Sequence, residues 1–341
     1  MSELVMIEQR RQLDGVGASL WVREGEERLP GQDSDARLIA LGAGLARHAG
    51  VRALDADAAD ATVERTLGAV HERCYLDALD RLEGEEPVVM AEFAPPGLEP
   101  DIPVNAGLVA TAREGVRTAI SAAQRTLAGA EYTYAVCRPP GHHAGPDFHA
   151  GYCYLNNAAA AVRTLLDGGL APVGILDLDL HYPNGTSALL ERLPDRNGDG
   201  PAATLHSLHA APVTNLPAGT ALPRLAGERA HAFEAAPDAD AYLAEVAASV
   251  AKLAGSVAAL VVSLGYDTVR GDPHGGWSLE PAVFERIGVL LAASGRPICV
   301  VQEGGYAVDA LAACAHAFAT GLLGEDRGRP SDRTPDQRTA T

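Results

Sequence analysis

The segment VGILDLDLHYPNGT (173–186) joins a strongly apolar run, VGILDLD (173–179), to a polar turn. Three further apolar runs end in the same way, namely YTYAVC (132–137), AALVVSLG (258–265) and ICVVQ (298–302). Helical patterns separate these runs, and apolar strands alternating with helices are typical of a parallel sheet covered on both faces. The sequence therefore predicts an α/β fold with a mostly parallel sheet.

Outward from these strands, the apolar spacing indicates one more strand, several helices and a long loop. ATLHSLH (203–209) predicts a strand, and the proline-containing residues 83–104 predict an irregular loop. Residues 1–30 are polar and ambiguous. No composition break marks a linker, so we expect one catalytic domain over 1–323 and a disordered tail over 324–341. Helices are expected at residues 37–48, 62–82, 106–128, 154–167, 186–192, 240–254, 280–294 and 307–322.

Acidic and imidazole side chains follow two of the strands, at the sheet edge where parallel sheets bind ligands. Asp179 and His181 are two residues apart on an extended segment, so they can share a face, and Asp267 follows the strand 258–265. Two carboxylates and an imidazole suit a catalytic Zn²⁺, with Fe²⁺ as an alternative ion. A capping turn would explain the first two residues alone, but four such motifs at one edge favour a metal site.

Two further motifs offer catalytic groups. His142 and His143 lie in a proline- and glycine-bounded loop, and histidines titrate near neutral pH, as general acids and bases must. A pair of exposed loop histidines is the alternative. Tyr306 follows Gly304 and Gly305, which let the backbone pass close to a substrate, and its phenol can donate a hydrogen bond to a developing oxyanion. A structural tyrosine after a turn is the alternative here.

Composition narrows the class of function. The chain has 45 acidic and 27 basic residues, a net charge of −18, which argues against binding to nucleic acids or anionic membranes and allows a cationic small substrate. The five cysteines form no CxxC pair and lie mostly in apolar runs, which predicts free thiols in a reducing cytoplasm. Neither a signal-length apolar core nor an apolar run of about 18 residues is visible. The oligomeric state stays open, a homodimer being one option.

Four motifs follow one another along the chain, namely RPPGHHAGPDFHAGYCYLNN (138–157), ILDLDLHYPNGT (175–186), SLGYDTVRGDP (263–273) and EGGYAVDAL (303–311). Together they resemble the motifs of the histone deacetylase family, most closely its bacterial acetylpolyamine amidohydrolases and class II-like branch. The resemblance covers residues 100–322 and extends more loosely over 35–80. It implies the arginase–deacetylase fold, with an eight-stranded parallel sheet, and metal-dependent amide hydrolysis.

The resemblance also implies a role for each matched position. The metal ligands would be Asp179, His181 and Asp267, and the catalytic side chains His142, His143 and Tyr306. The carboxylate that supports His142 and helps to hold a structural K⁺ with Ser207 would be Asp177, and the side chain that orients His143 would be Asn184. The substrate tunnel, its acidic rim and the acetate pocket would involve Tyr152, Gly151, Gly304, Asp101 and Arg37.

Two departures from the family pattern affect the expected substrate. Tyr182-Pro183 replaces a His-Gly pair after the first metal ligands, which puts a bulky ring near the metal loop, and the loop 208–220 lacks aromatic residues. We therefore expect a Zn²⁺-dependent deacylase of small acetylated amines, with acetylpolyamine first and a pathway intermediate or acetyl-lysine as alternatives. An arginase-like enzyme with two metals and a non-catalytic acyl-amine sensor are the rival functions.

Overall fold

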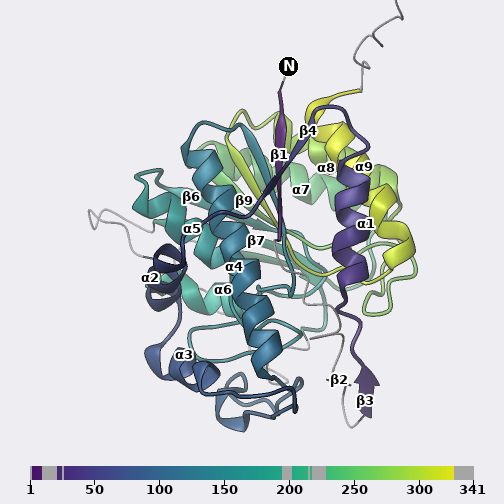
Figure 1. Cartoon of the computed structure of the whole chain (residues 1–341). Helices are drawn as coiled ribbons and strands as arrows, with labels where there is room; N and C mark the ends of the chain where they lie inside the picture. The colour runs from purple at the N-terminus through teal and green to yellow at the C-terminus, as the bar shows by residue number, and fades with distance from the viewer. Residues whose placement is uncertain are drawn as a thin grey trace, which may run out of the picture.

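The computed structural model describes residues 2–9, 21–24, 27–193, 202–213, 216 and 228–325, and its centre is an eight-stranded sheet (Figure 1). Every neighbouring pair of strands in this sheet runs parallel, which confirms the predicted α/β class and the parallel sheet. The strand order is β4(Val51–Asp55), β1(Leu4–Glu8), β5(Tyr132–Val136), β10(Ile298–Gln302), β9(Ala259–Leu264), β6(Val173–Asp177), β7(Ala203–Ala210) and β8(Glu228–Phe233).

The four strands that end in polar motifs are direct neighbours. The order β5-β10-β9-β6 places them side by side in the sheet, although they are not consecutive in the sequence. Their carboxyl ends therefore meet at one edge, and the loops after them converge there. This edge is the lower end of the sheet in Figure 1.

Helices cover both faces of the sheet because the strands alternate their apolar side chains between two cores. In β1, Leu4 and Met6 belong to one core, and Val5 and Ile7 belong to the other. The first core is covered by α1(Asp35–Leu45), α7(Ala239–Ala254), α8(Pro281–Ala292) and α9(Val308–Leu323). The second is covered by α4(Ala106–Leu127) and α5(Asn157–Asp167), against which α2(Asp60–Val70) lies.

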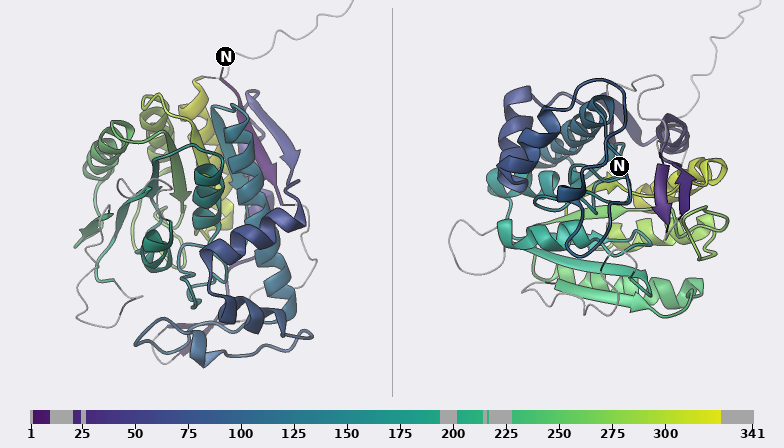
Figure 2. Two further views of the ribbon diagram at one scale, coloured as in Figure 1. Left: turned by 90° about the vertical axis from the view of Figure 1, so that its left-hand side faces the viewer. Right: turned by 90° about the horizontal axis from the view of Figure 1, so that it is seen from below.

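Shorter elements surround the carboxyl edge of the sheet. The right-hand view of Figure 2 shows the helices of the 60–80 region and the N-terminal hairpin on different sides of this end. The shorter elements are the hairpin β2(Trp21–Glu24)–β3(Glu27–Pro30), the helices α3(Arg73–Asp80) and α6(Asn184–Leu189), and the 3₁₀ turns Ala91–Phe93 and Leu190–Arg192.

Among the described residues, none of the helices has the length and apolar character that a bilayer crossing requires.

The single helix expected over 62–82 is wrong, because the chain forms two helices there. His71 has an extended backbone, with φ −100° and ψ 158°, and ends α2 before α3 begins at Arg73. Its imidazole Nδ1 lies 2.8 Å from the carbonyl oxygen of Gly145, and its Nε2 accepts from the backbone N–H of Asn156 at 3.0 Å. These long-range contacts stabilise the extended backbone at His71. The apolar spacing of the local sequence does not reveal them.

Three strands of the large sheet were not predicted. β1 lies in the N-terminal region that gave no periodicity, although four of its five residues are buried. β4 and β8 are the two edge strands, and their mixed polar sequences VRALD and ERAHAF are half-exposed. A half-exposed edge strand has no continuous apolar run to detect. The predicted tail 324–341 lies outside the described residues beyond Glu325.

Candidate active site

A cavity of about 500 Å³ opens at the carboxyl edge of the sheet, beyond the ends of the four central strands. Segments distant in the sequence meet in its wall: the hairpin, the 83–104 loop, and the loops that follow β5, β6, β9 and β10. Its lining is formed by Val22, Arg23, Pro95, Leu98, Glu99, Asp101, His142, His143, Ala150, Gly151, Tyr152, Asp179, His181, His274 and Tyr306.

At the base of the cavity, Asp179, His181 and Asp267 come together as predicted, and their ligand atoms lie within 4.8 Å of one another. The Nδ1 atom of His181 is 3.2 Å from Asp179 Oδ1 and 3.0 Å from Asp267 Oδ2. Backbone N–H groups hold both carboxylates: that of Gly304 donates to Asp179 at 2.8 Å, and that of Leu180 donates to Asp267 at 3.0 Å. The three side chains can therefore direct their ligand atoms at a single metal ion.

The electrostatics of these carboxylates fit a cation between them. Burial and the adjacent Asp179 raise the pKa of Asp267 to about 7, because two buried carboxylates resist ionising together. The backbone of Gly304 passes so close that an added Cβ would lie 2.6 Å from Asp179 Oδ2. A divalent ion would relieve the repulsion, and two carboxylates with one imidazole are a donor set that Zn²⁺ accepts.

The tandem histidines are both buried, with their rings 4.0 Å apart, but their environments differ. Burial alone would lower the pKa of His142, but Asp179 and Asp177 raise it to about 10. Its Nδ1 lies 3.3 Å from Asp177 Oδ2. Burial and the neighbouring His142 and His181 hold the pKa of His143 well below its usual value. At neutral pH the pair therefore consists of a cationic His142 and a neutral His143.

Asn184 sets the tautomer of His143. The Nδ1 atom of the imidazole lies 2.8 Å from Asn184 Oδ1, which can only accept, so the proton of a neutral His143 sits on Nδ1. This leaves Nε2 as the basic nitrogen. Gly151, with φ +52°, lies against the same ring, and an added Cβ would be 2.5 Å from its Cδ2 atom. Asn184 and Gly151 were both among the residues predicted for this site.

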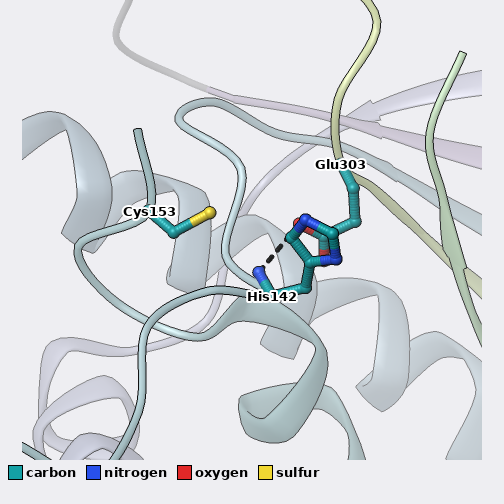
Figure 3. Close-up of side chains that lie close together, drawn as sticks. All are labelled: His142, Cys153 and Glu303. Atoms are coloured by element: carbon teal, nitrogen blue, oxygen red, sulfur yellow. Dashed lines mark hydrogen bonds between the residues drawn. The ribbon is translucent and has the colours of Figure 1, made fainter. Parts of the chain in front are cut away.

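Glu303 is a site residue that sequence reasoning missed. Its carboxylate is fully buried and accepts from the backbone N–H groups of Gly141, at 2.6 Å, and His142, at 3.0 Å. Burial raises its pKa to about 7. Figure 3 shows the thiol of Cys153 directed toward His142 and Glu303. The signal in the sequence was an acidic residue directly after the apolar strand ICVVQ, a position that ties the end of β10 to the histidine loop.

Tyr306 lies on the cavity wall, and two buried side chains fix its position. Asp272 accepts from the backbone N–H groups of Tyr306, at 2.6 Å, and Ala307, at 2.9 Å. The guanidinium carbon of Arg37 lies 4.5 Å from the centre of the phenol ring. Arg37 donates to the carbonyl oxygens of Glu303 and Gly305 at 2.6 Å each, and it lies beneath the ring rather than in the cavity lining. Asp272 was not singled out in the sequence.

The upper cavity contains two predicted residues and one that was missed. Tyr152 packs its ring 5.4 Å from that of Tyr306, and Asp101 accepts from the Gly151 N–H at 2.8 Å. His274 is the missed residue: its Nε2 lies 2.9 Å from the Tyr152 hydroxyl, and its ring contacts that of Tyr306 edge-on at 4.9 Å. His274 directly follows the motif GYDTVRGDP (265–273), so it lay just outside the stretch in which site residues were sought.

The bulky Tyr182 does not enter the cavity. Its ring is buried against that of His209, and its hydroxyl donates to Glu228 Oε1 at 2.6 Å. The bulky ring expected near the metal loop therefore leaves the cavity free, because the phenol turns toward β8. Ser207 is the register partner of Asp177 on the neighbouring strand. In the loop predicted over 208–220, residues 208–210 belong to β7, and residues 214, 215 and 217–220 lie outside the described residues.

The chain resembles known proteins in both sequence and fold. A family model for the histone deacetylase domain matches residues 32–322. The chain is 34% identical over 258 residues to acetylpolyamine amidohydrolase 1 of Pseudomonas aeruginosa, with 72% of each chain covered. It is 37% identical over 215 residues to the acetylpolyamine amidohydrolase of Mycoplana ramosa, with 60% of each covered.

Solved structures give the same result. The crystal structure of acetylpolyamine aminohydrolase from Burkholderia pseudomallei shares 26% sequence identity and superposes with a TM-score of 0.79. That match covers 94% of this chain and 98% of the other. The fold expected from the motifs is thereby confirmed, and the chain belongs to the histone deacetylase family of deacetylases and amidohydrolases.

Proposed function

We propose that this chain is a metal-dependent deacylase that releases acetate from small N-acetylated amines, with acetylpolyamines as the first class. One observation carries the proposal: a single cavity brings a carboxylate–imidazole donor set together with His142, His143 and Tyr306. The relatives named above support the amide-hydrolysing activity and the substrate class.

Asp179, His181 and Asp267 are the residues that we propose as ligands of the catalytic ion, with Zn²⁺ first and Fe²⁺ as the alternative. When bound there, such an ion polarises the amide carbonyl and lowers the pKa of a bound water to about 7. The repulsion between the two buried carboxylates supports this assignment.

His143 would be the general base and general acid, because its Nε2 is the basic nitrogen in the cavity. It would take a proton from the attacking water and later return it to the departing amine. His142, held cationic by Asp177 and Asp179, would stabilise the negative charge that develops on the carbonyl oxygen. The Tyr306 hydroxyl would donate a hydrogen bond to the same oxygen.

We further propose that Asp177 and Ser207 help to hold a structural K⁺ beneath the site. The two residues are register neighbours on β6 and β7, and both are buried. Asp177 also approaches His142. A monovalent cation here would keep this carboxylate ionised, and thereby keep His142 oriented and charged.

The test is a substrate panel run with metal analysis. Purified protein is assayed for acetate release from N-acetylputrescine, N-acetylspermidine, an acetyl-lysine peptide and a neutral N-acetyl amine, at low and high salt. We expect the acetylpolyamines to give the highest kcat/KM, together with about one divalent ion per chain. Fastest turnover of the peptide would overturn the small-substrate ranking, and no turnover of any amide would overturn the deacylase itself.

A further inference from the structure

A second group of metal-binding side chains lies in the interior, separate from the three proposed ligands of the catalytic ion. His142, Cys153 and Glu303 each offer one donor atom, and these atoms lie within 4.8 Å of one another. All three residues are at most 2% exposed. Figure 3 shows that they come from the loop after β5, the turn before α5 and the end of β10. Three different donor types thus meet in one buried place.

One oxygen of Glu303 lacks a hydrogen-bond donor. Its Oε2 atom accepts from the backbone N–H groups of Gly141 and His142. Its Oε1 atom is buried and makes no hydrogen bond within the described part of the chain. A buried acceptor without a partner is unfavourable, because it has lost its water. The thiol of Cys153 makes only a long hydrogen bond to the carbonyl oxygen of Gly151, at 3.4 Å. A ligand that binds Oε1 would therefore be stabilising.

The donor types and their charges favour a divalent cation as this ligand. Burial and the carboxylate of Glu303 raise the pKa of the Cys153 thiol well above its usual value, because two anions in one buried place repel each other. A thiolate and a carboxylate together balance a charge of 2+, so the occupied cluster would be neutral apart from its surroundings. Sulfur, imidazole nitrogen and carboxylate oxygen are the three ligand types of Zn²⁺ in proteins, and a thiolate also favours softer ions.

We propose that His142, Cys153 and Glu303 form a second metal site, which binds Zn²⁺ or a softer divalent ion present in excess and thereby inhibits the enzyme. Binding releases the thiol proton and the imidazolium proton, and the ion takes their place. His142 then loses the charge proposed to stabilise the oxyanion, so kcat falls for every substrate. The inhibition rests on the proposed function, whereas the site can be tested without any activity.

Absorption spectroscopy tests the site, because a thiolate bound to Cd²⁺ gives a charge-transfer band in the ultraviolet. Cys74→Ser serves as the parent protein, since Cys74 is exposed and would bind soft ions itself. The parent, loaded with one equivalent of Zn²⁺, is titrated with Cd²⁺, and bound ions are measured after gel filtration. We expect the band and a second bound ion. Cys153→Ala should lose both, whereas Cys299→Ala, the matched control with an equally buried thiol on β10, should keep both.

Inhibition is measured as the concentration of free Zn²⁺ that halves acetate release, and each variant is compared with its own rate at one equivalent of Zn²⁺. In Cys153→Ala this concentration should rise about tenfold or more, since removing even a side chain that only supports a metal ligand weakens binding to that extent. Glu303→Gln removes a ligand charge but keeps the side-chain shape, so it should show the same shift. This second variant decides the question if Cys153→Ala does not fold.

Three results would contradict the inference. Absence of the charge-transfer band in the parent would overturn the site, and a buried water would then be the partner of Glu303 Oε1. Retention of the band and of the second ion in Cys153→Ala would exclude the thiol as a ligand. Equal inhibition of Cys153→Ala and Cys299→Ala would overturn the inhibitory role. None of these results contradicts the proposed function, which fails only if no acetylated amine is hydrolysed.

Discussion

The base and the mouth of the cavity are built in different ways. At the base, Asp179, Asp267 and Glu303 are at most 1% exposed, and backbone N–H groups from neighbouring loops hold each carboxylate. At the mouth, Arg23 comes from a separate hairpin and Glu99 from the 83–104 loop. The central strands thus position the proposed catalytic groups, whereas appended segments line the mouth of the cavity.

This difference predicts large effects of base variants on every substrate and small, substrate-dependent effects of mouth variants. The largest effect is expected for Asp267→Asn, which keeps the side-chain shape but removes a charge from the proposed metal site. Bound divalent ion and activity should both be lost, as measured by metal analysis and acetate release. Asp309→Asn, an exposed change on α9, is the control. Full metal content with normal turnover in Asp267→Asn would exclude this residue as a ligand.

The second effect concerns the phenol of Tyr306. Tyr306→Phe should lower kcat by roughly 10²–10³, the typical cost of losing one oxyanion donor, and should change KM far less. The loss should be similar for every substrate, because the phenol is proposed to act on the amide carbonyl. Tyr242→Phe, a buried tyrosine outside the cavity, should keep wild-type kcat. A wild-type kcat in Tyr306→Phe would remove the tyrosine from the mechanism.

The third prediction concerns His71, whose contacts with Gly145 and Asn156 support the loop that carries His142 and His143. Burial lowers the pKa of His71 to about 4 from an ordinary 6.5. Its Nε2 accepts from the Asn156 N–H, which only the unprotonated nitrogen can do. The unfolded chain therefore binds more protons between these values, and stability falls as the pH falls. The full shift corresponds to about 3 kcal/mol of unfolding free energy, present above pH 6.5 and lost by about pH 4.

Urea unfolding at several pH values in this window measures the effect. His71→Asn cannot titrate, so its unfolding free energy should be lower at pH 7 and should change less between pH 7 and pH 4.5 than that of the wild type. The difference between the two curves isolates His71 from other histidines. Parallel curves for the two proteins would contradict the role of the neutral imidazole.

The smallest effect is expected at the mouth. His274→Phe keeps a ring against Tyr306 but removes the contact between His274 Nε2 and the Tyr152 hydroxyl. Losing one net hydrogen bond should raise KM by about three- to tenfold and leave kcat nearly unchanged. Steady-state kinetics on a long and a short acetylated amine would show it. A fall in kcat equal to that of Tyr306→Phe would assign His274 to the catalytic groups at the base of the cavity. It would contradict the predicted difference between base and mouth variants.

The sequence by itself determined the parallel sheet and most of the candidate site. Long apolar runs reveal buried central strands, and the polar residues that follow them must meet at one edge, so Asp179, His181 and Asp267 could be brought together without coordinates. The tandem histidines and Tyr306 were found by the same reasoning. These groups lie within two to seven residues of a strand end, so the strands determine where they lie.

Only the tertiary structure decided the rest, because those features depend on contacts between distant segments. Glu303 holds the histidine loop from 161 residues away, and His71 breaks a helix through contacts 74 and 85 residues away. Edge strands such as β8 lack an apolar run, so no local pattern marks them. The charge at the mouth of the cavity also depends on the tertiary structure: a net charge of −18 favoured a cationic substrate, yet the fold places the cationic Arg23 beside the cavity. Total charge is a property of composition, whereas the field that a substrate meets depends on which side chains the fold brings together.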